Sequence, residues 1–137
     1  MMTPNDQALL EAARAARENA YAVYSHFQVG AALRTRDGTI ITGCNVENGS
    51  YGLSICAERT AIVRAVAMGY TEFDTIAVVA HPLATPCGAC REFIIEFGQE
   101  IRVLCADAND LSRVQSWQIA ELLPDSFDRA SLPRSGQ

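Results

Sequence analysis

Segments of strand length and of helix length alternate along most of the chain, and this alternation most strongly limits how it can fold. Apolar runs typical of strands lie at residues 27–33, 40–46, 75–80 and 101–106. Segments typical of helices begin at Thr3-Pro4 and lie at residues 56–68 and 87–97. Alternating strands and helices predict a sheet that is covered by helices, an α/β layered fold.

Turn-forming and helix-ending residues stand between these segments. Thr3-Pro4 suits a helix start, because proline is tolerated at the first helical position. Asp37-Gly38 predicts a hairpin between the first two strands, since both residues tolerate positive φ. Gly69 and Gly98 follow the second and third helices and are expected to end them.

The C-terminal part of the sequence is less regular. Ser116 is expected to cap a last short helix that ends before Pro124, and residues 107–115 are assigned no element. Residues from 125 onward are mostly polar, and we expect this tail to fray after about residue 128. A chain of 137 residues is long enough for one domain with its own core, so we expect a single domain over residues 1–137.

Charge and composition limit the partners and the compartment. The formal net charge is −5, which disfavours a nucleic-acid partner, and no apolar run approaches the length of a membrane span. Residues 1–5 carry neither the basic nor the apolar part of a signal peptide, so we expect a cytoplasmic protein. In a reducing compartment, the five cysteines are thiols or metal ligands before they are disulfides.

Three of these cysteines form a pattern typical of a metal site. Cys87 and Cys90 are three residues apart at the start of the third helix, so their sulfurs share one face. Cys56 opens the second helix, and free N–H groups at helix starts favour thiolates. Three thiolates on one zinc ion leave the fourth tetrahedral position for water, as in a catalytic site. We therefore expect one Zn²⁺ per chain.

Glu58 and Arg59 follow the first of these cysteines. A carboxylate beside the water would take its proton and later deliver it to a leaving group, so Glu58 is the candidate general acid and base. Cys56 and Glu58 both flank one water only if the helix begins at about Cys56. Arg59 is expected to donate hydrogen bonds to the thiolates and so to preserve the acidity of the metal.

Two other interpretations of the cysteines remain open from the residues alone. Cys87 and Cys90 have the spacing of a redox dithiol, although no tryptophan precedes them. A closed structural zinc site would need a fourth ligand, for which Cys44, Cys105 and His81 are candidates. A lone cysteine in an apolar strand is more often a small buried apolar residue.

The pattern Cys56-Ala57-Glu58 with Pro86-Cys87-Gly88-Ala89-Cys90 resembles the signature of zinc-dependent deaminases. Within that superfamily the chain is similar to the small, homotetrameric cytidine deaminases. The similarity extends from the N-terminal helix to about Phe127, and its further segments are residues 24–32, 45–48, 59–61 and 121–124, together with Arg91. It implies a three-layer α/β/α fold with a mixed sheet of about five strands, and hydrolysis of cytidine or deoxycytidine to the uridine nucleoside and ammonia, a step of pyrimidine salvage.

The segment around Asn45 and Glu47 points to a nucleoside. Residues i and i+2 of a strand share a face, so the amide and the carboxylate offer two hydrogen-bonding groups to a sugar hydroxyl. The resemblance implies that both bind the 3′-hydroxyl. It also implies that Phe27 packs against the nucleoside, that Ala57 binds the pyrimidine edge through its backbone, and that Thr85-Pro86 flanks the leaving amine.

The resemblance also implies an assembly and an alternative substrate. In the family, an aromatic residue after a Leu-Leu-Pro segment stacks on the pyrimidine of a neighbouring subunit, and here that residue is Phe127. Related deaminases of nucleoside antibiotics use the same zinc chemistry on another substrate. We expect those enzymes to lack the carboxylate found at Glu47, so its presence favours a plain nucleoside.

Overall fold

A computed structural model describes residues 2–127 and 131–132 of the chain. The elements follow one another as α1 (Pro4–Arg17), β1 (Val29–Thr35), β2 (Ile40–Cys44), the short 3₁₀ helix η1 (Tyr51–Leu53), α2 (Ala57–Ala67), β3 (Phe73–Ala80), α3 (Gly88–Ile95), β4 (Arg102–Asp107), β5 (Asp110–Gln118) and α4 (Ile119–Leu122). Within this described part, the helices are too short or too polar to cross a membrane.

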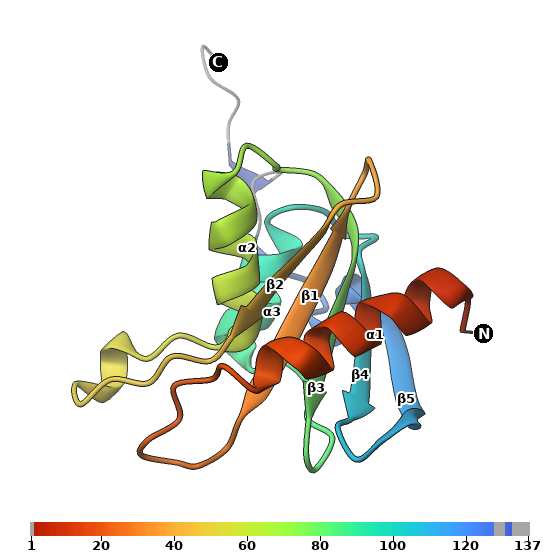
Figure 1. Cartoon of the computed structure of the whole chain (residues 1–137). Helices are drawn as coiled ribbons and strands as arrows, with labels where there is room; N and C mark the ends of the chain where they lie inside the picture. Colours follow the sequence, from red (N-terminus) through yellow and green to blue (C-terminus); the bar gives the residue numbers. More distant parts are fainter. Residues whose placement is uncertain (1, 128–130, 133–137) are drawn as a thin grey trace.

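One mixed sheet of five strands forms the centre of the structure, in the order β2-β1-β3-β4-β5 (Figure 1). β3 and β4 are parallel, and every other neighbouring pair is antiparallel. Helix α1 packs on one face through Leu9, Leu10 and Ala13, and the core of the other face includes Ala61 and Ile62 of α2 and Ile94 of α3. The expected three-layer α/β/α fold is therefore confirmed.

Strand β3 lies at the middle of the sheet and is buried on both faces. Ile76 and Val78 belong to the core on the α2 side, whereas Ala77 and Val79 belong to the core on the α1 side. Burial of successive residues on opposite faces explains why this strand reads as an unbroken apolar run in the sequence.

The expected helix start, hairpin turn and helix end in the N-terminal half are confirmed. The side chain of Thr3 accepts a hydrogen bond from the backbone N–H of Asp6, and the carboxylate of Asp6 accepts one from the N–H of Thr3. This reciprocal pair is a capping box at the start of α1. Gly38 and Gly69 have φ of 93° and 96°, so the hairpin and the end of α2 use conformations that favour glycine.

Gly43 of β2 sets how closely α2 lies on the sheet. A Cβ atom at this position would be 2.4 Å from the backbone nitrogen of Ala61 and 2.7 Å from the carbonyl oxygen of Ala57. Because both neighbours are backbone atoms of α2, a larger residue would push the helix away. The close approach of the N-terminal turn of α2, which carries Cys56 and Glu58, to strand β2 therefore depends on this glycine.

The region before the last helix differs from the sequence-based expectation. Ser116 does not cap a helix; it pairs with Leu104 as part of strand β5, and the last helix begins at Ile119 after Gln118. Most of β5 is exposed, as expected at the edge of a sheet, so it lacks the apolar pattern that indicates a strand. The expected frayed tail after about residue 128 lies outside the described residues, apart from 131–132.

Candidate active site

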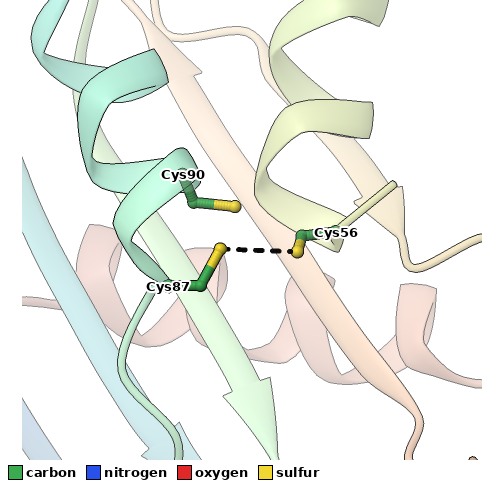
Figure 2. Close-up of side chains that lie close together, drawn as sticks. All are labelled: Cys56, Cys87 and Cys90. Carbon is green, nitrogen blue, oxygen red and sulfur yellow. Dashed lines mark hydrogen bonds between the residues drawn. The ribbon is translucent and has the colours of Figure 1, made fainter. Parts of the chain in front are cut away.

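The first turns of α2 and α3 bring three cysteines together beside the sheet. Cys56 and Cys87 are the N-cap residues of these helices, and Cys90 lies in the first turn of α3. Figure 2 shows the three side chains pointing toward one another. The Sγ atoms of Cys56 and Cys87 are 3.7 Å apart, and all three sulfurs lie within 4.8 Å of one another.

The spacing of these sulfurs fits a zinc ion. Thiolates bound tetrahedrally at about 2.3 Å have sulfur atoms about 3.8 Å apart, close to the observed Cys56–Cys87 separation. Hydrogen bonding within the cluster, first with Cys90 and then with Arg59, lowers the pKa of Cys56 to about 5. The same hydrogen bond, together with burial, raises the pKa of Cys90. One thiolate therefore forms readily here, as a metal ligand requires.

The structure does not bring the candidates for a fourth protein ligand into this cluster. Among residues 2–127 and 131–132, only Cys56, Cys87 and Cys90 form such a group. Cys105 is buried in the core, which raises the pKa of its thiol to about 12, and Cys44 ends strand β2. His81 instead pairs through Nδ1 with Asp107 at 2.9 Å. If the three cysteines held a metal ion, they would leave one position open, as in a catalytic type of site, and the involvement of Cys56 argues against a simple two-cysteine redox motif.

Glu58 lies in the first turn of α2 and is almost completely buried, with 4% of its surface exposed. Burial raises the pKa of this carboxyl to about 7, and the negative charge of Cys56 acts in the same direction. A carboxyl group whose pKa is near neutrality can both accept and return a proton, which suits the acid–base role expected from the sequence.

Arg59 contacts the cysteine cluster as the sequence predicts. Its Nη2 donates a hydrogen bond to the Sγ of Cys56 over 3.5 Å. Its Nε is buried and has no hydrogen-bond partner among the described residues. The positive charge is therefore held next to the thiolates, where it offsets part of their negative charge.

A cavity of about 270 Å³ opens beside the cluster. It is lined by Ser25, Phe27, Val29, Asn45, Glu47, Cys56, Ala57, Glu58, Val78, Ala84, Thr85 and Cys87. The candidate substrate-binding residues Phe27, Asn45, Glu47 and Ala57 thus face the same space as Glu58 and two of the cysteines. Phe127 does not line this cavity within one chain, and 62% of its surface is exposed.

The amide of Asn45 holds the segment that carries Phe27. Its Oδ1 accepts a hydrogen bond from the backbone N–H of Val29 at 2.9 Å, and its Nδ2 donates one to the carbonyl oxygen of Phe27 at 2.8 Å. These two bonds fix the backbone on both sides of residue 28. The residue predicted to bind a sugar hydroxyl therefore also positions the aromatic ring at the cavity, a function that the sequence did not indicate.

Glu47 makes a similar set of contacts with the neighbouring loop. Its carboxylate accepts hydrogen bonds from the backbone N–H groups of Tyr24 and Ser25, at 2.9 and 3.0 Å, and from the hydroxyl of Ser25. These bonds, first that of the Ser25 hydroxyl, lower the pKa of Glu47. A carboxylate offers about four acceptor positions, so Glu47 retains capacity for a further donor such as a sugar hydroxyl.

Ser25 is a cavity residue to which sequence reasoning assigned no role. Besides its bond to Glu47, its Oγ accepts a hydrogen bond from the backbone N–H of Phe27 at 3.0 Å. A serine hydroxyl often accepts a hydrogen bond from the backbone two residues further on, so this local contact could have been predicted from the sequence. Its partner Glu47, by contrast, lies 22 positions away and only folding reveals the contact.

Comparisons with known proteins agree with this geometry. The family model described as "Cytidine and deoxycytidylate deaminase zinc-binding region" matches residues 3–106. A probable cytidine deaminase from Dictyostelium discoideum is 49% identical over 127 residues, which cover 90% of this chain and 84% of that protein. A cytidine deaminase from Sporosarcina psychrophila is 43% identical over 126 residues, covering 90% and 92%.

A solved structure gives the same result. The crystal structure of cytidine deaminase from Burkholderia pseudomallei has 52% sequence identity and a TM-score of 0.84, and the match covers 92% of this chain and 100% of that one. A three-thiol cluster, a buried glutamate beside it and a matching fold over nearly the whole chain occur together. The chain therefore belongs to the cytidine and deoxycytidylate deaminase zinc-binding family.

Proposed function

We propose that this protein hydrolyses the exocyclic amine of cytidine, deoxycytidine or both, releasing ammonia and the uridine nucleoside. The observation that carries this proposal is the single cavity that Glu58, Cys56 and Cys87 share with Asn45 and Glu47. One small ligand in this cavity could therefore place its amine beside Glu58 and its sugar beside Asn45 and Glu47. The names of the relatives from Dictyostelium discoideum and Burkholderia pseudomallei support the same substrate class.

One zinc ion per chain would be held by Cys56, Cys87 and Cys90. When bound, zinc supplies a Lewis acid that makes a water molecule more acidic. Arg59 offsets the charge that three thiolates donate to the metal, through its hydrogen bond to Cys56.

Glu58 would carry the protons of the reaction. Its carboxylate takes one proton from the attacking water, and the oxygen of that water adds to C4 of the pyrimidine. Glu58 then delivers this proton to N3, takes the remaining proton from the hydroxyl now on C4 and passes it to the amine, so that the C4–N bond breaks, a C4 carbonyl forms and ammonia leaves. Its burial excludes bulk water from these transfers.

The remaining cavity residues would orient the nucleoside. Asn45 and Glu47 bind the 3′-hydroxyl of the sugar, and Phe27 packs against the nucleoside. The backbone of Ala57 binds the pyrimidine edge, and Thr85-Pro86 lies beside the leaving amine. The hydrogen bonds of Glu47 lower its pKa and so favour the charged carboxylate, which can accept a hydrogen bond from a sugar hydroxyl.

We further propose a homotetramer in which Phe127 completes the site of a neighbouring subunit. The exposure of Phe127 supports this proposal, because a large aromatic side chain gains by burial against a partner. The whole chain, residues 1–137, would act as one domain of each subunit. We place the enzyme in pyrimidine salvage in the cytoplasm.

Deamination of a nucleoside antibiotic is a second candidate function. Blasticidin-S deaminase from Bacillus cereus is 36% identical over 111 residues, which cover 74% of this chain and 77% of that protein. We favour the plain nucleoside because Glu47 is present at the cavity and can accept a hydrogen bond from a sugar hydroxyl.

A turnover screen tests the proposal. Purified protein is incubated with cytidine, deoxycytidine, free cytosine, adenosine and blasticidin S, and loss of the amine chromophore is followed by absorbance. We expect rapid turnover of cytidine or deoxycytidine and little turnover of free cytosine, which lacks the sugar. Preferential turnover of adenosine or of the antibiotic, or no turnover by protein that contains zinc, would contradict the assignment.

A further inference from the structure

Arg91, in the second turn of α3, directs its guanidinium back toward the segment that precedes the helix. Its Nε donates a hydrogen bond to the carbonyl oxygen of Pro86 at 2.8 Å, and its Nη2 donates one to the Oγ of Thr85 at 3.3 Å. Pro86 immediately precedes Cys87, and Thr85 lines the cavity. Arg91 therefore contacts the segment that leads into the cysteine at the start of α3.

The same guanidinium also contacts the C-terminal part of the chain. Its Nη1 donates a hydrogen bond to the carbonyl oxygen of Leu122 in α4 at 3.0 Å. Leu122 is 31 positions from Arg91, so this bond joins two elements that no local turn connects. The segment of residues 85–87 is thus held between its own helix and α4 by one side chain.

An arginine is required for this arrangement. Three nitrogens of one planar group donate to three acceptors, two of which are backbone carbonyl oxygens. Lysine has three donors on a single nitrogen atom and cannot reach acceptors spread around a plane in the same way. Removal of the guanidinium would leave the Pro86 carbonyl, on a buried residue, without this partner.

We propose that Arg91 is a positioning residue of the deaminase site, which fixes residues 85–87 so that Cys87 and Thr85 are presented correctly to the cavity. This inference rests on the proposed function and deepens it. Arg91 does not line the cavity and so would not touch the substrate. It acts on the metal through Cys87 and on the substrate through Thr85.

The experiment compares Arg91→Met with Arg64→Met as a matched control. Arg64 of α2 also donates from one guanidinium to a carbonyl and a hydroxyl, both of Thr42, but neither group lines the cavity. Zinc-loaded proteins are mixed with a chromophoric chelator, and the rate and midpoint of zinc transfer are measured. We expect Arg91→Met to weaken zinc retention by about 10- to 100-fold, the range for loss of groups that orient metal ligands. Arg64→Met should retain zinc as the unsubstituted protein does.

Two further variants separate positioning from a general loss of stability. Thr85→Val removes only the hydroxyl contact and should raise KM for cytidine while leaving zinc retention unchanged. Arg91→Ala should regain zinc retention when guanidinium is added at a concentration too low to unfold the protein, whereas sodium at the same ionic strength should have no effect. Zinc retention in Arg91→Met equal to that in Arg64→Met would overturn the proposal. Because zinc transfer is measured without substrate, failure of the proposed deamination would appear separately in the turnover screen.

Discussion

Cys56 and Glu58 line the same cavity although only one residue separates them. Within a continuous helix, side chains at i and i+2 point in clearly different directions. Here Cys56 is the N-cap, with extended backbone at φ −71° and ψ 157°, and the helix begins only at Ala57. The change in backbone direction at Cys56 therefore lets a thiolate and a carboxylate approach one ligand from the same side. The sequence allows this arrangement only with a helix start at about Cys56.

The first prediction concerns the metal. We expect one zinc ion per chain in the purified protein, and we expect Cys87→Ala to lose most of it because only two thiolates remain. The melting temperature should fall together with the zinc content, since metal binding is coupled to folding. Elemental analysis and thermal unfolding measure both quantities, and Cys44→Ala provides a control outside the cluster. Full zinc content in a variant in which Cys56, Cys87 and Cys90 are all alanine would disprove the assignment.

The second prediction concerns Glu58. We expect Glu58→Gln to retain zinc and to bind cytidine, but to lose about 10²- to 10⁴-fold in kcat, because the amide cannot carry protons. Steady-state kinetics give kcat, and titration of the inactive variant with cytidine gives the dissociation constant. A variant with nearly unchanged kcat would show that another group transfers the protons.

The third prediction concerns sugar recognition. We expect Glu47→Gln to lower kcat/KM for cytidine by roughly 10- to 150-fold, which corresponds to the roughly 1.5–3 kcal/mol of a hydrogen bond to a charged acceptor. The zinc content should stay the same, because Glu47 does not belong to the cysteine cluster. The matched control is Glu72→Gln, an exposed carboxylate that pairs with Arg36 away from the cavity. If both variants have the kcat/KM of the unsubstituted enzyme, the sugar-binding role of Glu47 is wrong.

The fourth prediction concerns assembly. Analytical ultracentrifugation should show a tetramer, and Phe127→Ala should raise KM for cytidine because stacking on the neighbouring site is lost. Zinc content should not change, since Phe127 does not contact the cysteine cluster in its own chain. Leu132→Ala removes another exposed apolar side chain of the C-terminal region and serves as the control. A monomer with full activity would rule out the shared site.

Much of the fold could be predicted because apolar runs and turn-forming residues in the sequence coincide with the buried strands and the turns of the structure. The apolar run of β3, the turn at Gly38 and the helix stop at Gly69 are all readable locally, and each agrees with the structure. Strand β5 could not be predicted from such signals. It is held by backbone pairing with β4 while most of its side chains are exposed, and backbone pairing leaves no trace in residue type.

The candidate site likewise contains features that could be predicted from the sequence and features that could not. The residues that would carry chemistry stand out in the sequence: Cys56 and Cys87 because cysteine is unusual at a helix start, and Glu58 because it stands beside Cys56. The contacts that hold the cavity in shape do not stand out, because they join side chains to backbone groups in distant parts of the chain. Asn45 bonds to the backbone at Phe27, and Arg91 bonds to the backbone at Leu122, and neither contact follows from sequence spacing.

The separation of Cys56 and Cys87 along the chain has a consequence for partial unfolding. These residues are 31 positions apart, and all of β3 lies between them. An ion held by both would close this segment into a ring for as long as the site stays intact, and it would leave the chain on complete unfolding, because the unfolded chain has no preformed site. During local openings that spare the site, the strand at the middle of the sheet would therefore stay tethered at both ends, which favours return to the native register.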